Sequence, residues 1–259
     1  AVAARGAEVV LHCAGRVSRD PADAALLTRV HVEGTKATLA AARSAGVRRV
    51  VLASTSGVVA VSRTACDPID ERAPAPLDVI GRWPYYRSKL FAEMAALEQS
   101  RDGLEVVAVN PTLLLGPGDL AGSSTGDVVD FLERRVPVIP SGGLSFVDVR
   151  DAAEAMVLAM DRGRPGERYL LAAQNLTVAA FCDRLERISG VPAPSLRLPE
   201  AAAGLATVGA RLLGRLAART RHVPAVDPVS AEMATHYWYV DSRKARRELA
   251  WSPRDPLDT

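Results

Sequence analysis

Tyr85 and Lys89 are the two residues of this chain whose types and spacing point most directly to chemistry. Pro84, a residue that suits the first turn of a helix, comes just before them, and the apolar and charged residues that follow alternate with helical period. Four residues make about one turn, so the phenol and the ammonium should project from the same face of the helix. Lysine is rare in this chain, which has only Lys36, Lys89 and Lys244, so a chance pairing at this spacing is uncommon.

A phenol beside an ammonium can do acid–base chemistry. A free phenol titrates near pH 10 and exchanges protons poorly at neutral pH, but a cation held beside it favours the phenolate. We therefore predict that Tyr85 is a general acid/base and that Lys89 lowers its pKa toward the working range. A surface helix on which the two side chains only pack together would show the same spacing, so the rest of the sequence has to decide.

Composition describes a globular protein. The 259 residues are 48% hydrophobic, enough for one large core or for a main domain with a small satellite. The net charge of +2 comes from 32 basic and 30 acidic residues spread along the chain, which gives no reason to propose nucleic acid or an acidic membrane as a partner.

Cysteines and apolar runs indicate the compartment. The three cysteines are far apart and form no cluster with histidine, so neither a disulfide framework nor a metal site is expected, and a reducing cytoplasm is the default location. The apolar stretch 201–216 is interrupted by Arg211 and Arg215 and is too short to cross a bilayer comfortably. We expect a helix packed on the protein there, with attachment to a membrane surface as the alternative.

Strand-like and helix-like segments alternate along the chain. Buried β-branched runs joined by helices of this length imply parallel βαβ units, in which ligand sites gather at the carboxyl ends of the strands. The sequence therefore predicts an α/β fold with a parallel sheet. The expected strands are 8–12, 49–53 and 104–109; the expected helices are 23–45, 85–98, 127–135 and 241–249, with two more beginning near residues 147 and 176, the second capped by Thr177.

In this context the sequence resembles the extended short-chain dehydrogenase/reductase family, also called the NAD-dependent epimerase/dehydratase family. The likeness covers nearly the whole chain and is closest to the dihydroflavonol-reductase-like and hopanoid-associated sugar-epimerase-like members. It implies a Rossmann-type doubly wound parallel sheet in residues 1–147, with a small substrate-side lobe in 148–259, some segments of which return to the core. The segments that carry the likeness, in the family's order, are 12–15, 32–35, 50–56, the Tyr85/Lys89 pair, 110–117 and 146–153.

The resemblance also implies roles for particular residues. Tyr85 would be the general acid/base, and Lys89 would both tune it and hold the nicotinamide ribose. Thr55 matches the family's catalytic Ser/Thr, whose hydroxyl would hold the substrate oxygen; its neighbours Ser54 and Ser56 are the alternatives. The cofactor, NAD or NADP, would lie against Cys13, Ala14, Gly15, Tyr85, Lys89, Pro111, Thr112 and Leu113, although Gly15 could also be a simple turn.

Two features depart from the family pattern. His31 stands where the family usually has asparagine, and it would serve either as a substitute hydrogen-bonding group or as a satisfied core histidine. The strand, G-x-x-G-x-x-G turn and helix that receive the pyrophosphate are also missing, because the glycines at 116–122 fall at a later loop. We expect that about the first quarter of a complete enzyme precedes Ala1. The choice between NAD and NADP is therefore not readable.

In the second half, we interpret Asp148 and Asp151 as structural carboxylates at a helix start, with substrate contact as the alternative. The aromatic cluster 237–239 is more typical of a core or interface than of a ligand platform.

Three functions remain open. The first is a nicotinamide-dependent reductase or dehydrogenase of a ketone/secondary-alcohol pair in a small molecule. The second is a nucleotide-sugar epimerase, which would use the same residues. The third is a non-catalytic regulatory protein that senses dinucleotide, although a sensor needs no acid/base. Pairing of helices into a homodimer is common in the families that the chain resembles.

Overall fold

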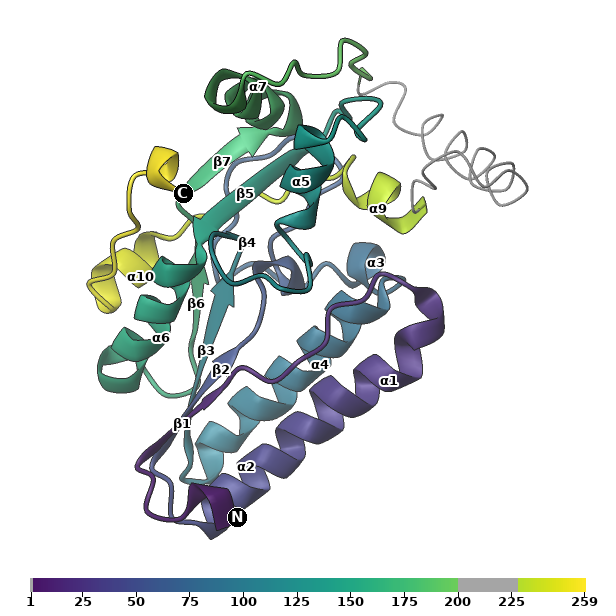
Figure 1. Ribbon diagram of the computed structural model, residues 1–259. Coiled ribbons are helices and arrows are strands. Elements are labelled where there is room, and N and C mark those ends of the chain that lie inside the picture. The colour runs from purple at the N-terminus through teal and green to yellow at the C-terminus, as the bar shows by residue number, and fades with distance from the viewer. Residues whose placement is uncertain (1, 200–227) are drawn as a thin grey trace.

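A parallel β-sheet forms the centre of the computed structural model, which describes residues 2–199 and 228–259 (Figure 1). Its strand order is β1-β2-β3-β6, and every neighbouring pair is parallel. This confirms the predicted α/β class. The four strands are β1 Val9–His12, β2 Arg49–Ala53, β3 Glu105–Pro111 and β6 Arg168–Leu171.

Helices cover both faces of this sheet (Figure 1). Successive side chains of a strand point to opposite faces, so alternate residues of β2 and β3 enter different cores. One core lies against α2 (Gly34–Ser44) and α4 (Pro84–Glu98), and the other against α6 (Val149–Arg162) and α10 (Arg243–Glu248). The first core takes Val50, Leu52 and Val106 from the strands, and the second takes Val51, Val107 and Val109.

The helix predicted over 23–45 is interrupted by one wider turn. It consists of α1 (Ala24–Thr28), a π-helical segment (Arg29–Glu33) and α2. Short π-helical segments often occur at functional sites, and this one carries His31.

The helix that carries Tyr85 and Lys89 begins at Pro84, as the sequence predicted, and runs to Glu98. Several other boundaries differ from the prediction by one to three residues. β3 continues through Pro111 because Asn110 and Pro111 pair with β6. α5 (Gly126–Leu132) stops short of 135 and is followed by Arg134 with φ 57°. The helix expected from 147 begins two residues later as α6, and the one expected from 176 begins as α7 (Val178–Ser189).

A smaller sheet lies beyond the carboxyl end of β3, with strand order β4-β5-β7. The chain passes from one sheet to the other at Thr112, where β3 ends and β4 (Leu113–Leu115) follows. β5 (Gly143–Asp148) pairs parallel with β4 and antiparallel with β7 (Gln174–Thr177), and α7 packs on them through Phe181. Two further short helices are α3 (Leu77–Ile80) and α9 (Pro228–Met233).

Within 2–199 and 228–259, no helix is long and apolar enough to cross a membrane. The same part of the chain contains no group of histidine, cysteine, aspartate and glutamate that could hold a metal ion. The apolar stretch at 201–216, for which a packed helix was predicted, lies outside the described residues.

Replacing Trp251 tests the core beneath α6. Its side chain is 1% exposed, and its Nε1 donates to the Asp151 carbonyl at 2.8 Å. Trp251→Ala should lower the free energy of unfolding by about 3–5 kcal/mol, measured by urea denaturation. Val157→Ala, at a side chain of α6 that is 52% exposed, is the control and should change it by about 0.5 kcal/mol or less. Equal effects of the two substitutions would contradict this assignment of the core.

Candidate active site

Lys89 joins α4 to the carboxyl end of β2. Its Nζ donates a hydrogen bond of 2.9 Å to the carbonyl of Ala53, the last residue of that strand. A β-carbon added at Gly15, in the segment that follows β1, would lie 3.5 Å from the same nitrogen. The fold therefore brings the ammonium, the end of β2 and the segment after β1 to one edge of the sheet, as parallel βαβ geometry predicts.

Tyr85 lies one turn before Lys89 on the same helix and is half-buried. Burial raises the pKa of its phenol to about 12. This direction is opposite to the lowering that we predicted from the neighbouring ammonium. The physical reason is the loss of solvent around the phenol, which disfavours its charged form. The protonated phenol is the form that can donate a proton to a carbonyl oxygen.

Among the three hydroxyls at the end of β2, that of Thr55 is the most accessible. Thr55 is half-buried, whereas Ser54 and Ser56 are buried, with 6% and 4% exposed. The Thr55 backbone is extended, and its Oγ1 accepts a long hydrogen bond of 3.4 Å from the Gly57 amide. This difference in exposure supports Thr55 over its two neighbours as the hydroxyl that contacts a substrate.

His31 is hydrogen-bonded through both ring nitrogens. Its Nε2 accepts from the Arg16 amide at 3.1 Å, so the other nitrogen, Nδ1, carries the proton and donates to Ser88 Oγ at 2.8 Å. Burial and the nearby Lys89 lower its pKa to about 4. Its ring also meets that of Tyr85 edge-on, with centroids 5.6 Å apart. The arrangement is that of a satisfied core histidine, which ties the π-helical segment to α4.

Several known proteins are similar to this chain. A model of the NAD-dependent epimerase/dehydratase family matches residues 1–172. The chain belongs to this family. It is 32% identical over 251 residues to a Synechocystis protein provisionally named dihydroflavonol 4-reductase, covering 95% of this chain and 71% of that protein. It is also 32% identical over 253 residues to sterol demethylase protein B of Methylococcus capsulatus, covering 97% of this chain and 76% of that protein.

Among solved structures, the crystal structure of gox2253 superposes with a TM-score of 0.81 at 29% sequence identity, over 99% of this chain and 77% of that one. These findings confirm the Rossmann-type fold and the likeness to extended short-chain dehydrogenase/reductases of the dihydroflavonol-reductase type. Enzymes of this family depend on NAD or NADP.

Family members need a place for the nicotinamide end of the dinucleotide, and the strand ends of this chain fit one. Cys13, Ala14 and Gly15 are small and exposed, so a ring could approach the backbone beside Lys89. Thr112, at the crossing between the two sheets, is 8% exposed, and its Oγ1 has no hydrogen-bond partner among the residues that the structure describes. Pro111 is buried and Leu113 is half-buried, on either side of it.

An aromatic wall lies beside Tyr85, and the sequence did not identify it. We use this name for Tyr86 and Trp238, whose ring centroids are 5.1 Å apart and which both pack on Trp83. Tyr86 also meets Tyr85 edge-on at 5.0 Å. Gly57 lies under the wall, where an added β-carbon would be 2.2 Å from the Tyr86 ring. Trp238 belongs to the aromatic cluster expected in a core or interface, but it is half-buried.

Two carboxylates interpreted as structural are engaged within the fold. Asp148 caps α6 by accepting from the Arg150 amide at 2.8 Å. Asp151 accepts from both the backbone amide and the side chain of Arg254, at 2.9 and 2.8 Å. These contacts support the structural interpretation of both residues.

The pH dependence of stability tests the environment of His31. Its pKa in the folded state, about 4, is below the ordinary 6.5, so the unfolded chain binds the proton more readily. The stability from neutral His31 is therefore complete above pH 6.5 and is lost as pH falls toward 4. We expect an NMR titration midpoint near 4 for its ring protons. The difference in unfolding free energy between the wild type and His31→Gln should shrink over the same range. A midpoint near 6.5 would contradict the buried, neutral state.

Proposed function

We propose that this protein is an NAD(P)-dependent reductase or dehydrogenase that transfers hydride between nicotinamide and a ketone/secondary-alcohol pair of a small molecule. The observation that carries the proposal is the hydrogen bond from Lys89 to Ala53. It sets α4 so that Lys89 lies against the segment after β1 and the carboxyl end of β2, with Tyr85 in the preceding turn of the same helix.

In this proposal Thr55, Tyr85 and Lys89 divide the work on one oxygen atom. The accessible Thr55 hydroxyl holds the substrate carbonyl oxygen in place. Tyr85, protonated because of its raised pKa, donates its proton to that oxygen in reduction, and in the reverse direction the phenolate left by this transfer takes the proton of the alcohol. The nicotinamide, when bound, supplies or accepts the hydride. Lys89, beside Gly15, is placed to bond the ribose hydroxyls and so to orient the ring.

The aromatic wall supports a substrate with a planar, apolar part next to the reacting carbon. Tyr86 and Trp238 are both half-buried, and each keeps part of its surface open to solvent. Trp238 Nε1 already donates to the Met233 carbonyl at 3.1 Å, so what remains of that side chain is apolar. Aromatic faces stack well on planar groups but offer few hydrogen bonds to sugar hydroxyls. This chemistry favours a ketone reductase over a nucleotide-sugar epimerase.

Of the two alternative functions, an epimerase would use the same residues and a dinucleotide sensor would use none of them for catalysis. Epimerisation would remove hydride with the same acid/base and return it to the other face of the ketone, with no net consumption of cofactor. A dinucleotide sensor would need neither the phenol nor the hydroxyl, and the presence of Thr55, Tyr85 and Lys89 together in the sequence argues against it.

Substitution of the phenol tests the proposal. Tyr85→Phe should lower kcat with an aromatic ketone by about 10²–10⁴-fold, because the proton donor is lost. Cofactor affinity, measured by NADH and NADPH fluorescence titration, should stay nearly unchanged.

Tyr86→Phe is the matched control, since it removes a neighbouring phenol from the same helix and should leave kcat within a few-fold. Near-normal turnover of the Tyr85→Phe protein would remove this residue from the mechanism. Turnover of a nucleotide sugar without net oxidation of the cofactor would favour the epimerase instead.

The substrate class is tested at Trp238. Trp238→Ala should raise KM for an aromatic ketone about tenfold with little change in kcat, because a stacking surface is lost away from the reacting atoms. Trp238→Phe keeps an aromatic face and should retain most of the affinity. If KM is unchanged in a Trp238→Ala protein whose thermal unfolding midpoint matches that of the wild type, the aromatic wall does not bind the substrate.

A further inference from the structure

Glu93 is a fully buried carboxylate on the helix of the proposed catalytic residues. Its exposure is 0%, and it follows Lys89 by four residues, as Lys89 follows Tyr85. The three side chains therefore occupy successive turns on nearly one face of α4, in the order phenol, ammonium, carboxylate. Burial of an ionised carboxylate is costly unless partners compensate for the lost water, so the contacts of Glu93 call for explanation.

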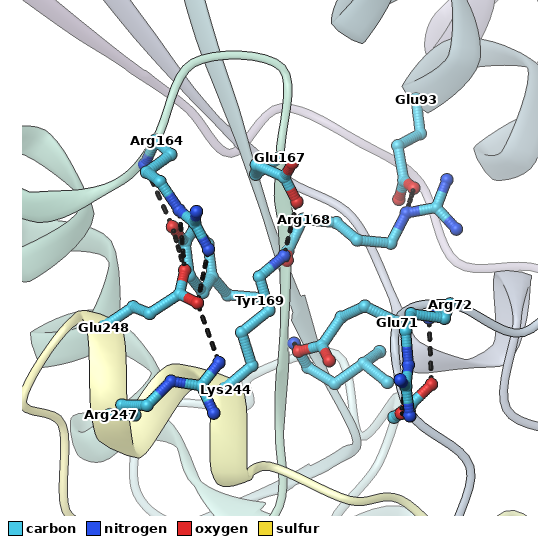
Figure 2. Close-up of polar contacts among 12 residues, drawn as sticks. Glu71, Arg72, Glu93, Arg164, Glu167, Arg168, Tyr169, Lys244, Arg247 and Glu248 are labelled. Carbon is cyan, nitrogen blue, oxygen red and sulfur yellow. Dashed lines mark hydrogen bonds and ion pairs between the residues drawn. The ribbon is translucent and has the colours of Figure 1, made fainter.

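Both oxygens of Glu93 have close partners. Oε1 lies 2.8 Å from Nε of Arg168, the first residue of β6, whose side chain is 19% exposed. Figure 2 shows Arg168 reaching toward Glu93 and away from Arg164, Lys244 and Glu248. Oε2 accepts from Asn110 Nδ2 at 2.6 Å. An ion pair on one side and a hydrogen bond on the other thus hold the carboxylate in one place.

Asn110 links Glu93 to Thr55 by hydrogen bonds. The same Nδ2 group donates to the Thr55 carbonyl at 3.0 Å, and Asn110 is itself 0% exposed. Lys89 meanwhile bonds the Ala53 carbonyl. Two carbonyls that flank Ser54 at the end of β2 are therefore held from successive turns of α4, one directly by Lys89 and one from Glu93 through Asn110.

Glu93 also acts on Lys89 through charge. Burial lowers the pKa of the lysine, and Glu93 is the strongest of the neighbours that oppose this shift, followed by Cys13. The other titratable groups near the ammonium are His12, whose pKa is lowered by burial and by Lys89, and His31, whose pKa is near 4. Both imidazoles are therefore neutral at pH 7. Arg168, on the far side of Glu93, opposes the effect of the carboxylate.

We propose that Glu93 is a positioning residue of the active site: it keeps Lys89 in its charged form and, through Asn110, fixes the backbone that presents the Thr55 hydroxyl. The expected effect of Glu93 on turnover rests on the proposed function. Its expected effect on the protonation of Lys89 does not. A purely structural ion pair between Glu93 and Arg168 predicts that removing either partner has the same effect. A positioning role predicts different effects on Lys89.

NMR of lysine separates the two cases, because the chain has only Lys36, Lys89 and Lys244. With ¹³C-labelled lysine, the Lys89 Cε signal is identified as the one absent from Lys89→Arg, and its shift is followed against pH. Glu93→Gln keeps the shape of the side chain but removes its charge. We expect it to lower the Lys89 midpoint by about one unit, a tenfold change in the ratio of charged to neutral lysine.

Arg168→Gln is the matched control, since it breaks the same ion pair but keeps the carboxylate. We expect the pH midpoint of the Lys89 titration to stay unchanged or to rise, because a neighbouring positive charge has been removed. An unchanged midpoint in Glu93→Gln, or an equal fall in both variants, would overturn the proposal. If Glu93→Gln does not fold, a fall of the Lys89 titration midpoint in Arg168→Gln would also overturn the proposal.

Turnover gives the second readout. Glu93→Gln should lower kcat/KM about tenfold at neutral pH and weaken cofactor binding progressively at higher pH, as Lys89 loses its proton. Arg168→Gln should not show this pH dependence of binding, and if it does, the proposal is wrong. Retained turnover in Tyr85→Phe would reject the proposed function. If Tyr85→Phe loses turnover as expected and Glu93→Gln has the kinetics of the wild type, only the positioning role is rejected.

Discussion

The hydrogen bond from Lys89 to the Ala53 carbonyl is the interaction on which the site depends. It joins a helix on one face of the sheet to the carboxyl end of a central strand at 2.9 Å. Because the side chains of α4 repeat at about one turn, fixing this turn also sets the direction of the turns before and after it. Tyr85 and Glu93 are thereby placed on nearly the same face of α4 as Lys89.

Burial decides which protons are present at this edge. Loss of solvent raises the pKa of Tyr85 and lowers those of Lys89 and His31. At neutral pH the site therefore combines a protonated phenol with a neutral, doubly hydrogen-bonded imidazole. Such a site is richer in hydrogen-bond donors than in bases, which suits the delivery of a proton to a carbonyl oxygen. The opposing charge of Glu93 is what offsets the effect of burial on the ammonium.

Local pattern predicted much of the fold and part of the site. β2 and the start of α4 were predicted because hydrophobic period and a helix-opening proline depend on near neighbours in the chain. The extension of β3 to Pro111 was missed because it depends on pairing with β6, a strand much later in the sequence. Glu93 was also missed, although its spacing from Lys89 repeats that of Lys89 from Tyr85 and could have been noticed.

The sequence by itself determined the α/β alternation and the helix face that Tyr85 and Lys89 share, since periodic spacing encodes both, and its motifs carried the resemblance to the family. Only the tertiary structure decided which hydroxyl of the Ser54–Thr55–Ser56 run is accessible and that Arg168 is the partner of Glu93. It also decided that burial, and not the neighbouring ammonium, governs the pKa of Tyr85. Spacing specifies which side chains are neighbours along a helix, whereas solvent exposure and charge pairing depend on segments that meet only after the chain has folded.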